Sequence, residues 1–186
     1  MKKLLLAVLV LSSSVFAAPF QVDTAHSKIT FKVKHLAISN VYGSFAKYDA
    51  NIEYDVNSKK LNTLTADVDV NSVDTDNVKR DGHLKSADFF DAKQFPKIAF
   101  KLISTSADEA IAELTIKGIT KKVTFDYENN GVIKDPWGNT KLGLSLETKI
   151  SRKAFGLTWN KVLETGSFVV GDKITINVDI EAKKIN

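Results

Sequence analysis

Apolar and polar residues alternate with period two through most of the chain after residue 27. Successive side chains of a β-strand point to opposite faces of a sheet, so this pattern predicts strands with one apolar and one polar face. The clearest run has Ile174, Ile176 and Val178 alternating with Thr175 and Asn177. Eight runs share the pattern: residues 28–33, 52–54, 66–70, 98–102, 110–116, 123–127, 142–146 and 173–181.

Short segments with turn-forming residues separate these runs, which predicts that neighbouring strands pair antiparallel. The segments are 55–58, 104–108, 129–131, 136–139 and 171–172. About eight successive strands with one apolar face favour an all-β fold, a single antiparallel up-and-down barrel, because closure removes exposed sheet edges. The interior of such a barrel is either filled by side chains or holds one small ligand.

The alternation stops between Arg80 and Asp91, where apolar residues such as Leu84, Phe89 and Phe90 follow irregular or helix-like intervals. We interpret this stretch as a short helical insertion laid across the barrel, with its aromatic side chains turned inward. It would then act as the lid of the space that the sheet encloses.

The N-terminus predicts export. Lys2 and Lys3 precede an apolar run over residues 4–11, and small residues at 12–17 form a cleavage region. We expect a signal peptide over residues 1–17, cleavage after Ala17, a barrel domain over residues 18–186, and a periplasmic location.

The mature chain would have 186 − 17 = 169 residues, the size of one domain with its own core. Its formal charge would be 24 − 22 = +2, with acids and bases interspersed, which argues against nucleic-acid binding. There is no cysteine, so burial must stabilise the domain without disulfides.

The apolar face could point into a barrel interior or toward the lipid of an outer membrane. The charged alternates, such as Lys32, Asp67 and Lys173, favour the first arrangement, because a narrow lumen could hold them only with extensive pairing. An outer-membrane barrel stays as an alternative.

Six segments are informative when taken together: Asp23–Ser27, Phe31–His35, Gly43–Phe45, Arg80–Asp91, Leu114–Thr120 and Ser151–Gly156. In this order, and over essentially the whole mature chain, they resemble the YceI family. The resemblance implies an exported, lipocalin-like barrel that binds a long apolar molecule: a polyisoprenoid, an isoprenoid quinone or a fatty amphiphile. Such a cargo implies transient contact with a membrane; the oligomeric state stays open, with a homodimer as one option.

The inward alternates are the candidates for contacts with the ligand tail, with two further aromatic residues in the lid. They are Phe31, Val33, Phe45, Val68, Phe100, Leu114, Phe125, Leu144 and Val178, with Phe89 and Phe90. The alternative for each is a place in a dry core, because small barrels commonly fill their interiors.

Arg80 and His83, followed by His35, are the candidates for the ligand head, because guanidinium and imidazole groups donate hydrogen bonds to phosphate or quinone oxygens. Alternatively, Arg80 pairs with Asp81 and fixes the insertion, and Arg152 does the same for the turn at residues 151–156.

No nucleophile elbow accompanies the histidines and carboxylates, so we expect no enzyme. Histidines at 26, 35 and 83 lack zinc-ligand spacing, so we expect no metal and no cofactor. The alternative function is a stress-related structural or partner-binding barrel with a solid core.

Overall fold

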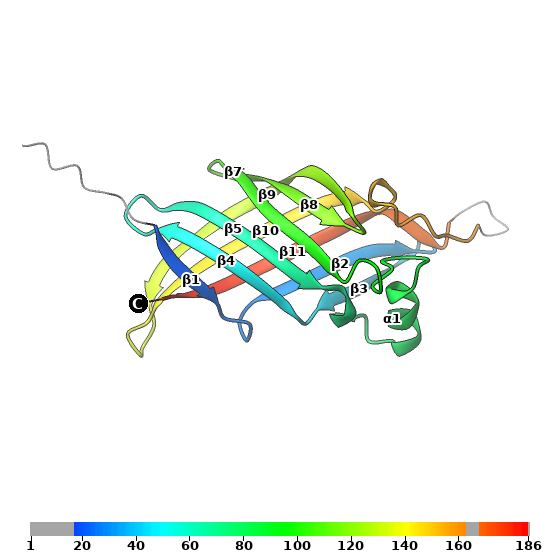
Figure 1. Ribbon diagram of the computed structural model, residues 1–186, viewed down its shortest axis with the longest axis horizontal. Coiled ribbons are helices and arrows are strands. Elements are labelled where there is room, and N and C mark those ends of the chain that lie inside the picture. The colour runs from blue at the N-terminus through cyan, green and yellow to red at the C-terminus, as the bar shows by residue number, and fades with distance from the viewer. Residues whose placement is uncertain (1–16, 163–167, 186) are drawn as a thin grey trace, which may run out of the picture.

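Eight antiparallel strands close into a barrel, which confirms the fold class. The computed structural model describes residues 17–162 and 168–185. In order around the barrel, the strands are β1 (Ala18–Val22), β4 (Tyr48–Asp55), β5 (Lys60–Asp69), β7 (Lys97–Thr105), β8 (Glu109–Ile116), β9 (Ile119–Lys134), β10 (Thr140–Ser151) and β11 (Val170–Lys184). The ring closes because β1 pairs with both β4 and β11 (Figure 1).

A hairpin of β2 (Lys28–His35) and β3 (Ser39–Phe45) lengthens the wall at one end. β11 pairs with β1 through its last residues and with β2 through the rest, so β1 and β2 form one wall interrupted at residues 23–27. The two-residue strand β6 (Val73–Asp74) pairs with the end of β3.

The apolar alternates point inward and the charged alternates outward, as the soluble arrangement requires. In β10, Leu142, Leu144 and Leu146 are buried, whereas Glu147 and Lys149, which follow them on the opposite face, are exposed. Among the described residues, no helix is long and apolar enough to cross a membrane.

Two of the predicted turns are wrong. Asn129–Gly131 lies inside β9, and Gly171–Asp172 lies inside β11. At each place the register shifts against the neighbouring strand, which is the mark of a β-bulge. A bulge and a turn can use the same residues, because both accept the left-handed backbone of Gly131, with φ of 89°.

The insertion is helical over a shorter range than predicted. Helix α1 spans Val78–Lys85, and the side chain of Asn77 accepts a hydrogen bond from the Arg80 amide at 3.0 Å as its N-terminal cap. The chain then passes through turns, which contain Phe89 and Phe90. We call residues 78–95 the lid segment; Figure 1 shows its helix beside one end of the barrel.

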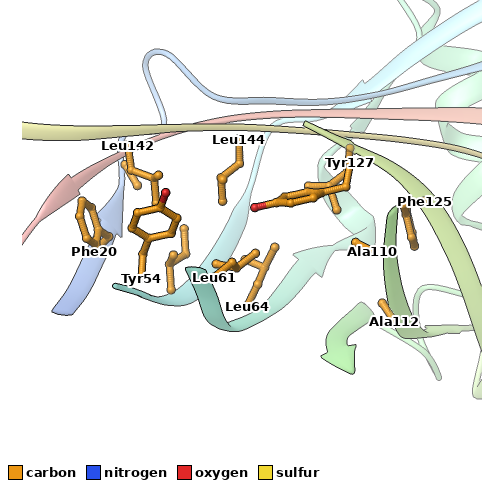
Figure 2. Close-up of a cluster of buried hydrophobic side chains, with 13 residues drawn as sticks. Phe20, Tyr54, Leu61, Leu64, Ala110, Ala112, Phe125, Tyr127, Leu142 and Leu144 are labelled. Atoms are coloured by element: carbon orange, nitrogen blue, oxygen red, sulfur yellow. The ribbon is translucent and has the colours of Figure 1, made fainter. Parts of the chain in front are cut away.

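Buried side chains form two clusters at opposite ends of the barrel. The first cluster closes the end that holds the start of β1 and the end of β11; it includes Phe20, Tyr54, Leu142 and Leu144. Figure 2 shows these side chains projecting toward one another from facing strands. The second cluster includes Phe89 and, from the short 3-10 helices η1 (Val70–Ser72) and η2 (Lys153–Phe155), Val70 and Phe155.

Candidate functional site

A cavity of about 180 Å³ lies inside the barrel between the first cluster and the lid segment. Leu64, Phe125 and Leu146 bound it toward the first cluster, and Leu84, Phe89 and Phe90 line it from the lid segment. Its lining is almost wholly apolar; the polar exceptions are Ser27, Thr30, Tyr48, Arg152 and Asp179. The barrel is therefore solid at one end and hollow beneath the lid segment.

Ten of the eleven predicted tail residues line this cavity: Phe31, Val33, Phe45, Val68, Phe89, Phe90, Phe100, Leu114, Phe125 and Val178. Leu144 is not among the described lining residues. It is 0% exposed and packs in the first cluster, because Phe20 and Tyr54 fill the interior at its level. The alternation predicts which face each residue occupies, and ligand contact by these residues stays a prediction.

Aromatic side chains hold the lid segment against the barrel end. The Phe90 ring meets Phe45 edge-on at a centroid distance of 6.0 Å. On the other side, Phe89 and His83 both pack on the indole of Trp159, at 5.2 Å and 4.8 Å. The lid segment is thus tied both to β3 and to the chain that follows η2.

The guanidinium of Arg80 binds Thr75, which precedes the lid segment. Its Nε donates to Thr75 Oγ1 at 2.8 Å and its Nη2 to the Thr75 carbonyl at 2.7 Å. The same hydroxyl donates to Asp81 Oδ1 at 2.5 Å. Arg80 and Asp81 therefore meet at the buried Thr75 without pairing directly, an arrangement that fixes the start of α1.

The two predicted histidines also lie away from the cavity wall. The Nε2 atom of His83 lies 2.9 Å from Asp88 Oδ2, and its ring packs outside Phe89. His35 ends β2, opposite Val170. Neither histidine nor Arg80 is among the described lining residues, so their role in head binding stays a prediction.

Arg152 is a basic residue of the cavity lining, and our head-group candidates omitted it. Its side chain is 2% exposed. The guanidinium donates to the carbonyls of Gly171 at 2.9 Å, Trp159 at 2.9 Å and Val170 at 3.3 Å, and to that of Leu157. Burial lowers the pKa of this guanidinium below its ordinary value, and the charge of Asp172 opposes that effect.

A sequence signal for Arg152 exists. Counting by twos along β10 from Leu142 through Ile150 keeps to the inward face, and residue 152 is the next position. A period-two count therefore predicts that this arginine faces the interior just beyond the strand.

A second polar cluster lies at the interruption between β1 and β2. Lys141 Nζ lies 2.8 Å from a carboxylate oxygen of Asp23 and 2.8 Å from one of Glu181. His26 Nδ1 lies 3.0 Å from Asp23 Oδ2, the same oxygen that Lys141 contacts. These hydrogen bonds, from Lys141 first and from His26 second, lower the pKa of Asp23 to about 2. Asp23, His26 and Glu181 are spaced as metal ligands could be, but the ammonium of Lys141 already joins the two carboxylates.

Comparison with known proteins gives consistent matches over the barrel. The sequence model of the YceI-like domain matches residues 20–182. A UPF0312 protein of Staphylococcus aureus strain USA300 is 40% identical over 163 residues, which cover 87% of this chain and 95% of that protein.

Solved structures share the architecture. The YceI protein of Campylobacter jejuni superimposes with a TM-score of 0.71 at 36% identity, over 82% of this chain and 90% of that one. A structure described as a polyisoprenoid binding domain from Saccharophagus degradans gives a TM-score of 0.67 at 11% identity, over 91% of this chain and 99% of that one. At that identity the second likeness shows the fold alone.

Proposed function

Because this chain belongs to the YceI-like domain family, we propose that it is a periplasmic carrier or store for a lipid with a long apolar tail, held inside the barrel. The cargo would be a polyisoprenoid, an isoprenoid quinone or a fatty amphiphile. The observation that carries this proposal is the apolar cavity between the first cluster and the lid segment. The description of the Saccharophagus degradans domain as polyisoprenoid-binding supports the same class of cargo.

The energetics favour a carrier that exchanges its cargo with a membrane. Moving a tail of about forty carbons out of water would gain on the order of 30 kcal/mol, whereas non-covalent complexes reach only about 20 kcal/mol. Such a lipid resides in a bilayer, so the tail exchanges one apolar environment for another and most of the gain cancels. The fit of the tail and the contacts of the head then decide affinity.

Export, membrane contact and the absence of catalysis complete the proposal. The basic start and apolar run of residues 2–11 support export with cleavage after Ala17. Membrane contact is supported by the exposed Ile38 and Tyr42 of the β2–β3 hairpin, which lie near the exposed Lys34. We propose no catalytic role.

Lipid extraction from protein purified from the periplasm of the cell that makes it, followed by mass spectrometry, tests the function. We expect a stoichiometric long-chain lipid from the wild type. Ala66→Phe should displace it, because Ala66 lines the cavity and a phenyl group would occupy the space. Thr65→Phe is the matched control, since residue 65 points to the outer face of the same strand. Wild-type protein without lipid would instead favour the structural or partner-binding barrel.

A further inference from the structure

The cavity has two chemically different ends. Toward the first cluster its boundary is formed by the apolar Leu64, Phe125 and Leu146, and by Asp179, whose carboxylate accepts a hydrogen bond from Ser145 Oγ at 3.1 Å. Arg152 lines the cavity at the opposite end, where it contacts the carbonyl of Leu157 of the second cluster. The basic lining residue therefore lies at the lid end of the cavity, and the acidic lining residue, Asp179, lies toward the first cluster.

The positive charge of Arg152 has no carboxylate in contact within the described residues. Its four hydrogen-bond acceptors are all backbone carbonyls, which are neutral. Asp172 acts on Arg152 only through its charge, and its carboxylate accepts hydrogen bonds from Ser151 Oγ at 2.8 Å and the Lys153 amide at 3.3 Å. A buried charge without an opposite charge is unfavourable, and an anionic ligand would relieve that cost.

The guanidinium is also fixed in position. An arginine has five N–H donors, and the four carbonyls take four of them, which leaves one on Nη2. The carbonyls belong to two separate segments, residues 157–159 and residues 170–171. Because these acceptors hold the group in place, a ligand would find its donor already oriented, at little cost in side-chain entropy.

We propose that Arg152 is the head-group anchor of the cavity and that the cargo has an anionic, oxygen-bearing head, such as a phosphate or carboxylate. The head lies at the lid end beside Arg152, and the tail points toward Phe20 and Tyr54. This inference rests on the proposed function, since it names the class and orientation of the cargo of that same cavity. It assigns the anchor to a residue on the cavity wall, in place of Arg80 and the histidines of the sequence-based prediction.

Head-group preference is measured first on delipidated wild-type protein, with three probes that share a sixteen-carbon tail below their micelle concentrations. Hexadecyl phosphate should bind about tenfold more tightly than hexadecanol, since a charge-assisted hydrogen bond replaces a neutral one. Hexadecyltrimethylammonium should bind most weakly. Equal affinities for the phosphate and the alcohol, or tight binding of the cation, would overturn the anchor. Failure of all three probes would count against the proposed function itself.

Inorganic phosphate separates a lipid site from a free-anion site. Without a tail it should not bind at millimolar concentration, because the cavity is apolar. Binding of phosphate alone would show that the arginine serves a small anion and would overturn the lipid assignment.

Variants then test the residue. Arg152→Met should remove the preference for hexadecyl phosphate over hexadecanol, in protein whose fold is verified by circular dichroism. Lys153→Met is the matched control: it removes the same charge one residue away, from an exposed side chain over the Phe168 ring. The control should keep the preference. If Arg152→Met does not fold, the wild-type comparison still decides the proposal.

Orientation is read from Trp159, whose carbonyl accepts a hydrogen bond from Arg152. Trp137 is 83% exposed in the β9–β10 turn at the other end, so Trp137→Phe leaves one reporter at the lid end. Hexadecanoic acid brominated at carbon 2 should quench its fluorescence more strongly than acid brominated at carbon 16. The reverse order would show that the head lies at the first cluster and would refute the assignment.

Discussion

Phe31 and Gly43 face each other across β2 and β3, and the ring covers the glycine so closely that a methyl group at residue 43 would lie 2.4 Å from Phe31 Cζ. Phe31 also lines the cavity and contacts the Phe45 ring at 5.7 Å. The absent side chain at residue 43 thus determines where one aromatic wall of the cavity lies.

Gly43→Ala should therefore force the Phe31 ring from its place and destabilise the protein by about 1–3 kcal/mol, as overpacking does. Urea unfolding followed by circular dichroism measures the change. Gly82→Ala is the control: it lies in α1 with no atom near the added methyl, and should stabilise by about 0.5–1 kcal/mol. A Gly43→Ala protein as stable as the wild type would contradict the close packing.

Leu142 and Leu114 allow one deletion to be compared in the solid and the hollow parts of the barrel. Leu142 is 0% exposed in the first cluster, whereas Leu114 lines the cavity. In lipid-free protein, Leu142→Ala should cost about 4 kcal/mol and Leu114→Ala about 2 kcal/mol, because Leu114 already has empty space on one side. Denaturant unfolding checks the order, and equal losses would argue that both places are equally filled.

Trp159 should slow the escape of cargo past the lid segment. Trp159→Ala removes ring contacts to His83 and Phe89, each worth about 0.5–1.5 kcal/mol. Release of a fluorescent fatty acid to acceptor vesicles, followed by stopped flow, should become about three- to tenfold faster. Trp137→Ala, at the far end, should leave the rate unchanged. Equal rates for both variants would exclude the lid segment as the barrier.

Asp23 should make stability depend on pH in the acid range. Its pKa is about 2 because Lys141 and His26 donate to it, against an ordinary value of 3.8. A carboxyl with a lowered pKa contributes its full stabilisation above pH 4, and loses it as the pH falls toward 2. Asp23→Asn should cost about 1 kcal/mol or less at pH 7, since solvent screens the cluster. The two proteins should converge in urea midpoint near pH 2; a constant difference would contradict the assignment.

Arg80→Ala separates the two roles considered for that residue. Loss of its hydrogen bonds to Thr75 should lower stability by about 1–3 kcal/mol. A role in fixing α1 predicts that alone, whereas a role in head binding predicts a changed lipid in the organic extract as well. Lys79→Ala, at the exposed neighbouring position, serves as the control for stability.

The barrel was predictable because period-two alternation is a local property that burial of one face enforces. The positions of the β-bulges in β9 and β11 were not predictable from this pattern. Gly131 and Gly171 are in bulges, and a glycine that permits a bulge is indistinguishable by residue type from one that permits a turn. The alternation pattern also did not predict strands β1 and β3. In β3, Ser39 and Tyr42 are not part of a regular alternation.

Alternation predicted which residues of the candidate site face the barrel interior, but it did not predict which of them line the cavity. Alternation places both Leu144 and Leu146 inside, but which of them meets a cavity depends on how far Tyr54 and Phe20 extend from strands remote in sequence. The lid segment posed the same difficulty: Arg80 faces Thr75 because of the path of the chain before α1. Arg152, by contrast, was accessible to the period-two count along β10.

The filled end of the barrel would limit the routes by which a lipid could enter and leave the proposed carrier. With Phe20, Tyr54 and Leu142 closing the interior, a tail that enters beneath the lid segment cannot pass through to the opposite end. In the proposed carrier, the lipid would therefore enter and leave beneath the lid segment, and the protein itself would impose no direction on the transfer. Net transfer would run from the membrane that is richer in the lipid to the one that is poorer. The distance from the lid segment to Phe20 and Tyr54 would limit the length of the lipid chain that fits.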